Sequence, residues 1–102
     1  MAQKIVWTER ALEDFEQVKS YILSEFGTVV FSKFLSSFLR KINLISNSPF
    51  LYPATSHKKY TRKAVVNKRL ILFYRYKPRK NEIEIISLWN TRRKSATNKG
   101  KN

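Results

Sequence analysis

A single glycine interrupts the longest helical pattern in the sequence. From Glu9 to Phe26 apolar residues recur every three or four positions, and the same spacing returns from Thr28 to Ser46. Gly27 stands between the two stretches, where a left-handed C-terminal cap is expected, because glycine adopts a positive φ without a side-chain clash. Thr8 is placed as the N-cap of the first stretch. The pattern therefore predicts two amphipathic helices folded into a hairpin, with their aromatic stripes in the core.

Short β-rich segments lie on both sides of this helical pattern. Lys4–Trp7 precedes it, and Pro49 and Pro53 end it, because each proline disfavours helix at the residue before it. Three further strands are predicted over Lys63–Asn67, Leu70–Tyr76 and Glu82–Trp89. The residues expected to share one face of the last strand are Ile83, Ile85, Ser87 and Trp89. The predicted fold class is α+β, in the order β-α-α-β-β-β, with the helical hairpin packed on one face of a small antiparallel sheet.

Positive charge is concentrated in the second part of the chain. The 102 residues include Lys+Arg 21 and Asp+Glu 7, a formal net charge of +14. Through Lys41 there are six basic and five acidic residues, whereas the remainder has fifteen basic and two acidic ones. Such a dipolar chain attracts polyanions by one face, because Lys and Arg displace counterions from phosphates. Nucleic acid or an acidic protein is therefore the expected partner.

The composition excludes several kinds of chemistry. The sequence has no cysteine and one histidine, which removes disulfides, thiolate catalysis and the usual zinc sites. It contains neither a P-loop nor a nucleophile elbow, so we expect no cofactor. We find no signal peptide and no apolar run near the roughly 18 residues of a membrane span, and we expect a cytoplasmic protein. The length fits one domain over residues 1–93, followed by a mobile basic tail over 94–102.

Basic residues flank the predicted strands of the second part. The first group comprises Lys58, Lys59, Arg62, Lys63, Lys68 and Arg69, and the second comprises Arg92, Arg93 and Lys94. Because the ends of neighbouring antiparallel strands lie close together, we expect both groups to converge with Arg75 on one concave surface. Tyr60, Tyr74 and Trp89 are interleaved with these cations. These aromatic residues either stack unpaired bases or belong to the core of the sheet.

Groups for acid–base catalysis are few in this part of the chain. Glu82 and Glu84 share a strand face and are predicted to pair with Lys or Arg rather than to form a catalytic dyad. His57 is the one side chain expected to titrate near neutrality and is a candidate general base, although loop histidines are more often bystanders. Metal-independent RNA cleavage remains possible, since clustered cations stabilise a pentacovalent phosphate.

Several of these segments resemble a known family over residues 4–93. They are Ile5-Val6-Trp7-Thr8, Arg62-Lys63-Ala64-Val65-Val66, Leu70-Ile71-Leu72-Phe73-Tyr74-Arg75 and Ile83-Glu84-Ile85-Ile86-Ser87-Leu88-Trp89-Asn90-Thr91-Arg92-Arg93. Their order and spacing are similar to the RelE/ParE superfamily of type II toxins, which includes plasmid stabilisation proteins. The resemblance implies a sheet curved around a helical hairpin, growth inhibition, and a cognate antitoxin that covers the active surface.

The resemblance also implies roles for individual residues. Arg62 and Arg92 match the arginines that open the strand meander and end its last strand. In a RelE-like endonuclease that cuts mRNA on the ribosome, these two would be catalytic, with His57 as a further base. The residues expected to bind the target are Lys58, Lys63, Lys68, Arg75 and Arg93. Arg92 ranks first, because its backbone follows a buried strand while its side chain can reach outward.

The sequence departs from the RNA-cleaving relatives at its end. These relatives usually carry a tyrosine or histidine near the C-terminus, whereas Trp89 is the last aromatic residue here. The departure leans toward ParE-like members, which act on DNA gyrase, or toward a member without toxicity. Whether the chain is an enzyme is left open, and a non-toxic basic RNA-binding module is the alternative function.

Overall fold

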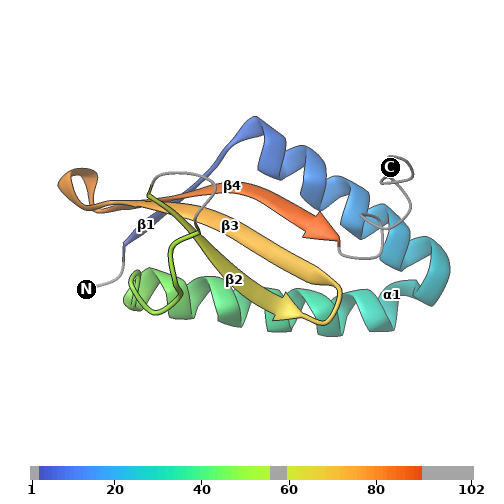
Figure 1. Cartoon of the computed structure of the whole chain (residues 1–102). Coiled ribbons are helices and arrows are strands. Elements are labelled where there is room, and N and C mark those ends of the chain that lie inside the picture. The colour runs from blue at the N-terminus through green and yellow to red at the C-terminus, as the bar shows by residue number, and fades with distance from the viewer. Residues whose placement is uncertain (1–2, 56–59, 91–102) are drawn as a thin grey trace.

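The computed structural model describes residues 3–55 and 60–90, whose arrangement is shown in Figure 1. The elements are β1 (Lys4–Trp7), α1 (Glu9–Asn47), β2 (Thr61–Asn67), β3 (Leu70–Lys77), the 3₁₀ turn η1 (Pro78–Lys80) and β4 (Glu82–Asn90). The predicted α+β class and the order of the elements are confirmed. Each predicted strand of the meander lies within the observed one, and the bounds differ by at most two residues.

Gly27 divides α1 into two halves that fold back on each other. Its φ of 88° and ψ of −179° are not helical, and the chain reverses there (Figure 1). Thr8 caps the first half, because its side-chain oxygen accepts a hydrogen bond of 3.0 Å from the backbone nitrogen of Ala11. The Phe15 ring joins the halves, with centroid distances of 6.4 Å to Phe34 and 5.5 Å to Phe38. The predicted hairpin and its glycine break are confirmed.

By length and composition alone, α1 could cross a membrane, since one 18-residue window reaches a mean hydropathy of 1.3. The sequence expectation overlooked this window. One such helix is weak evidence for a membrane protein, because a core helix passes the same test. In this structure α1 is broken at Gly27, and both of its halves contribute side chains to the core.

The four strands form one sheet in the order β1-β4-β3-β2. The pairs β2–β3 and β3–β4 are antiparallel, as predicted for the meander. β1, however, pairs parallel with β4, with Lys4 opposite Glu82 and Trp7 opposite Ile85. The sheet is therefore mixed rather than wholly antiparallel. A tight turn forces its two strands to be antiparallel, but the chain between β1 and β4 is long and leaves their direction free.

The core lies between α1 and one face of the sheet. Its members from the sheet are Ala64, Leu70, Leu72, Tyr74, Ile83, Ile85 and Leu88, and those from α1 are Ala11, Val18, Phe38, Ile42 and Ile45. A β-bulge changes the alternation in β4, since Phe73 is opposite Ser87 while Tyr74 is opposite Ile85, which leaves Ile86 as an extra residue. Leu88 therefore follows Ile85 on the core face. The prediction that Ser87 and Trp89 share a face with Ile83 is wrong for this reason.

The start of α1 closes the edge of β4. β1 pairs with β4 only as far as Ile85, so the β4 backbone beyond it has no strand partner on that side. The Thr8 hydroxyl donates toward the carbonyl oxygens of Ile85 and Ile86, at 3.0 and 2.9 Å. The Asp14 carboxylate accepts a 3.0 Å hydrogen bond from the backbone nitrogen of Leu88. These bonds fix the first half of α1 across the sheet edge and satisfy backbone groups there.

We predict that Gly27→Ala lowers the free energy of unfolding by about 1–3 kcal/mol, because the φ/ψ region of Gly27 is open almost only to glycine. No atom lies within 4 Å of a Cβ built at this position, so the loss would come from the backbone alone. Urea unfolding of the variant measures it. Ser36→Ala, at an exposed position of the second half, should change stability by less than about 0.5 kcal/mol. Equal stability of Gly27→Ala and the wild type would contradict the prediction.

Candidate functional site

The face of the sheet opposite α1 carries a mixture of charged and apolar side chains. In β3 the residues that alternate with the core are Ile71, Phe73, Arg75 and Lys77, and in β4 they are Glu82, Glu84, Ser87 and Trp89. β2 adds Lys63 and Val65, which are opposite Phe73 and Ile71. We call this surface the uncovered face. Both halves of α1 contribute to the core on the other side, so no helix of the described residues covers the uncovered face, and Thr61 at its β2 end is buried.

One end of the uncovered face holds a network of two positive and two negative side chains. Arg75 Nη1 lies 3.8 Å from a Glu84 oxygen, and Lys77 Nζ lies 3.6 Å from Glu84 and 3.9 Å from Glu82. All four side chains are partly shielded from solvent. The prediction that Glu82 and Glu84 pair with basic residues is confirmed. A phosphate approaching Arg75 would compete with Glu84 for the guanidinium, and the role of Arg75 in target binding remains a prediction.

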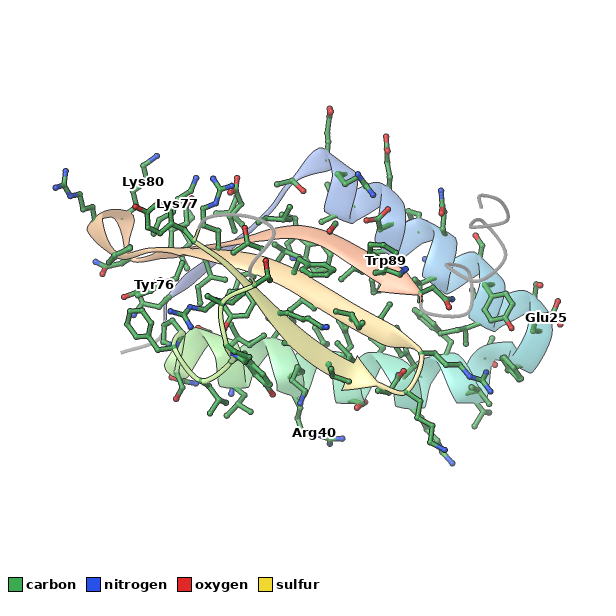
Figure 2. All side chains as sticks on the ribbon, viewed as in Figure 1. Glu25, Arg40, Tyr76, Lys77, Lys80 and Trp89 are labelled. Carbon is green, nitrogen blue, oxygen red and sulfur yellow. The ribbon has the colours of Figure 1, made fainter. Side chains whose placement is uncertain are left out.

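The other end of the uncovered face is apolar. Trp89 is 44% exposed, and its ring centroid lies 6.4 Å from that of Phe73. Figure 2 shows Trp89 and Lys77 at opposite ends of the sheet, in agreement with the register, in which Trp89 is opposite Ile71 and Lys77 is opposite Glu82. The β-bulge turns Trp89 toward this face. Aromatic side chains of this kind are enriched in protein interfaces.

Arg62 does not lie on the uncovered face. It is opposite Tyr74 in the sheet, and therefore points to the side of α1. Its Nη1 donates a 2.7 Å hydrogen bond to the carbonyl oxygen of Tyr52, and its guanidinium carbon lies 4.9 Å from the centre of the Phe50 ring. Lys41 Nζ contacts the Tyr52 hydroxyl at 2.8 Å, which holds the same loop from α1. In this structure Arg62 fixes the loop between α1 and β2.

Tyr74 belongs to the core and does not offer a face for base stacking. Its side chain is fully buried, and its hydroxyl donates a 2.8 Å hydrogen bond to the carbonyl oxygen of Pro49. Burial raises the pKa of Tyr74 above the ordinary value of 10.0, although the positive charge of Arg62 opposes this rise. Of the two interpretations given to this residue, membership of the sheet core is correct.

The predicted basic residues that the structure describes do not gather on one surface. Lys63 is exposed on the uncovered face, but Lys68 and Arg69 form the turn between β2 and β3, at the far end of β2 from the Thr61–Arg75 pair. The expected convergence of Lys68 and Arg69 with Arg75 is therefore wrong, because the length of β2 separates them. The predicted site residues that lie outside the described residues are His57, Lys58, Arg92 and Arg93. Their roles remain predictions.

The described residues include two further features that bear on function. Within residues 3–55 and 60–90, no group of three or more His, Cys, Asp or Glu side chains could hold a metal ion. A pocket of about 300 Å³ opens at the bend of the hairpin, between the two halves of α1 and the β2–β3 turn. The sequence does not indicate this pocket, because the apolar residues that line it have the same helical spacing as the residues of the core.

The chain belongs to the ParE toxin family of type II toxin-antitoxin systems, parDE, whose family pattern matches residues 5–95. No curated protein matches the sequence. Among solved structures, a chain of the chromosomal ParDE system from P. aeruginosa has a TM-score of 0.72 at 14% identity, covering 87% of this chain and 96% of that one.

Two other solved toxins share the fold. A chain of the intact E. coli RelBE toxin-antitoxin complex has a TM-score of 0.62 at 17% identity, covering 87% of this chain and 96% of its own. The YoeB/ParE toxin from Agrobacterium tumefaciens has a TM-score of 0.63 at 14% identity, with coverage of 85% and 96%. The family match confirms the resemblance to the RelE/ParE superfamily, and this protein is a type II toxin.

We predict that Arg62→Ala lowers the free energy of unfolding by about 2 kcal/mol, because it removes a charged hydrogen bond to Tyr52 and a ring contact with Phe50. Arg62→Lys should restore part of this loss. Lys63→Ala is the matched control, since Lys63 is exposed on the other face of the same strand. Urea unfolding distinguishes the two roles of Arg62. An Arg62→Ala protein with normal stability that no longer inhibits growth would favour a direct contact with the target.

A second prediction concerns the pH dependence of stability. Because the folded-state pKa of Tyr74 is raised, the folded protein holds this proton more tightly than the unfolded chain does. The stabilisation that Tyr74 gives the folded state is complete below pH 10.0, the ordinary pKa of tyrosine. It is lost as the pH rises through the higher pKa of Tyr74 in the folded state. At neutral pH, Tyr74→Phe should cost about 1 kcal/mol for the lost hydrogen bond. The stability difference between wild type and Tyr74→Phe should shrink above pH 10.0, and a constant difference would contradict the prediction.

Proposed function

We propose that this toxin inhibits growth by binding DNA gyrase and not by cutting mRNA on the ribosome. The observation that carries the proposal is the state of Arg62 and Arg75, the two arginines of the predicted site that the structure describes. Arg62 binds the Tyr52 carbonyl on the α1 side of the sheet, and Arg75 is paired with Glu84. Phosphoryl transfer requires cations that are free to stabilise the charge of the transition state. Among the described residues, neither of these guanidinium groups is placed to do so.

The uncovered face has the chemistry of a protein-binding surface. Its charged end is balanced between Arg75 and Lys77 on one side and Glu82 and Glu84 on the other. Its apolar end presents Trp89 beside Phe73. Aromatic groups next to paired charges give shape and charge complementarity to another protein, whereas an RNA strand favours a continuous positive groove. A protein target such as gyrase therefore fits this face better than an RNA strand does.

A cognate antitoxin is the expected partner of the chain. The family pairs toxins with antitoxins, and the E. coli structure with a TM-score of 0.62 is a toxin-antitoxin complex. A toxin that acts on gyrase would work in the cytoplasm, where gyrase meets DNA. We further propose that residues 1–93 act as one domain and need no cofactor, with residues 94–102 as a basic tail.

Expression of this chain without its antitoxin tests whether gyrase is the target. We predict slower growth, DNA breaks and an SOS response on induction, together with loss of supercoiling activity when purified gyrase is mixed with the chain. Trp89→Ala should weaken gyrase inhibition about tenfold or more, because it removes the exposed aromatic group of the uncovered face. Leu39→Ala, at an exposed position of α1, is the matched control and should leave inhibition unchanged within about twofold. Arg92→Ala should abolish growth inhibition.

The other outcomes identify the alternatives. Cleavage of ribosome-bound transcripts inside codons, with gyrase supercoiling intact, would replace the proposal with RelE-like mRNA cleavage. In that case His57 becomes the first candidate base to mutate. Binding to ribosomal RNA without any effect on growth would instead favour a passive RNA-binding module.

A further inference from the structure

The two halves of α1 carry opposite net charges. The first half, residues 9–26, has five acidic residues and two basic ones, whereas the second half, residues 28–47, has three basic residues and no acidic one. The sequence has no Asp or Glu from Phe26 to Asn81. The second half therefore attracts a polyanion and the first half repels it, so the charge of α1 sets the side from which a polyanion approaches.

The basic residues of the second half share one side of the helix. Lys33 lies seven positions before Arg40 and eight before Lys41, which is about two helical turns. Lys33 and Arg40 are exposed, and neither forms an ion pair within residues 3–55 and 60–90. Figure 2 shows Arg40 on the outer side of α1, pointing away from the strands. We call the side of α1 that carries Lys33, Arg40 and Lys41 the cationic ridge.

A polar pocket of about 460 Å³ opens beside the cationic ridge, between α1 and the end of β2. Arginine, lysine, asparagine and serine are side chains that donate hydrogen bonds to the phosphate and sugar oxygens of nucleic acids. Five of the seven residues that line the pocket are of these types. The seven are Ser37, Arg40, Lys41, Asn43, Leu44, Asn47 and Val66. The pocket therefore adds hydrogen-bond donors to the charge of the ridge.

The composition of this surface indicates which polyanion it fits. None of the described residues that line the pocket is aromatic. Single-stranded nucleic acids are held largely by stacking their bases on aromatic rings, and protein partners are often anchored by aromatic residues. A DNA duplex keeps its bases stacked inside and presents a dense row of phosphates. Donors and cations without an aromatic ring therefore match the backbone of a duplex.

We propose that the cationic ridge binds the phosphate backbone of duplex DNA, with Lys33 and Arg40 as its main contacts. Lys41 is already engaged, since its Nζ donates a 2.8 Å hydrogen bond to the Tyr52 hydroxyl. The inference rests on the proposed action on gyrase, an enzyme that holds duplex DNA. The uncovered face lies on the other side of the sheet from α1, so the chain can contact gyrase and DNA together. Phosphate contacts carry no base sequence, so the ridge accepts any duplex that gyrase holds.

Titration of a short fluorescent DNA duplex with the full chain, followed by anisotropy, tests this inference. Arg40→Gln should weaken binding about three- to tenfold and reduce the slope of log affinity against log salt concentration by about one, because one phosphate contact is lost. Lys33→Gln should act in the same direction. Arg10→Gln is the matched control, because it makes the same charge change on the first half of α1, where Arg10 is paired with Asp14. It should stay within about twofold of the wild type.

Titration with gyrase separates this inference from the proposed function. Arg40→Gln should bind DNA-free gyrase within about twofold of the wild type, and the gyrase–DNA complex about three- to tenfold more weakly. Wild-type binding to gyrase, with Arg40→Gln and Lys33→Gln no weaker than Arg10→Gln on the duplex, would overturn the cationic ridge and leave the proposed function intact. Absence of gyrase binding, with duplex binding that depends on Arg40, would overturn the proposed function and support the ridge alone.

Other probes identify the competing partners. Tighter binding of single-stranded DNA or of an RNA duplex than of the DNA duplex, with the same dependence on Arg40, would assign the ridge to that nucleic acid and overturn the proposal. Loss of binding to phosphatidylglycerol vesicles in Arg40→Gln, with duplex binding unchanged, would assign it to a membrane surface. Both ridge residues are exposed, so both variants should unfold in urea within about 0.5 kcal/mol of the wild type.

Discussion

The hydrogen bonds between the start of α1 and the edge of β4 determine the rest of the architecture. β4 is nine residues long, but β1 has four residues and covers less than half of it. Thr8 and Asp14 supply the missing partners for Ile86 and Leu88, so the helix must leave β1 directly across the edge of the sheet. That crossing places both halves of the hairpin over one face. No helix of the described residues covers the opposite face, because α1 is the one long helix among them.

The basic residues lie at other places in the fold than their order in the sequence predicts. Arg62 lies on the α1 side, where it fixes the loop through Tyr52 and Phe50. Arg75 and Lys77 are balanced by the two carboxylates of β4. The remaining described cations of the predicted basic surface, Lys63 and the Lys68–Arg69 turn, lie at separate places. Within residues 3–55 and 60–90, these cations therefore do not form one basic groove, and the uncovered face combines paired charges with an exposed aromatic residue.

Local rules predicted the elements of this fold well, and long-range pairing limited what they could predict. Gly27 and Thr8 act through their own backbone neighbourhood, so the hairpin and its cap were both predictable. The parallel pairing of β1 with β4 joins residues that are far apart in the sequence, such as Lys4 and Glu82. No short-range pattern in the sequence predicts it. The bulge at Ile86 has the same character, since one extra residue reverses the face of Trp89 without changing the sequence alternation. Arg62 was misplaced because strand alternation identifies two sides but does not tell which side the helix covers.

The pairing of β1 with β4 also has a consequence for biosynthesis. Thr8 and its β4 partner Ile85 are separated by 77 residues, and the bond between them forms only after β4 has left the ribosome. Until then the hairpin has been synthesised without the sheet face that buries Val18, Phe38 and Ile45. Contacts of such long sequence separation slow folding and leave apolar surface exposed for longer. The described fold is therefore completed only after the synthesis of β4, which delays the appearance of the toxin's surfaces until that strand has left the ribosome.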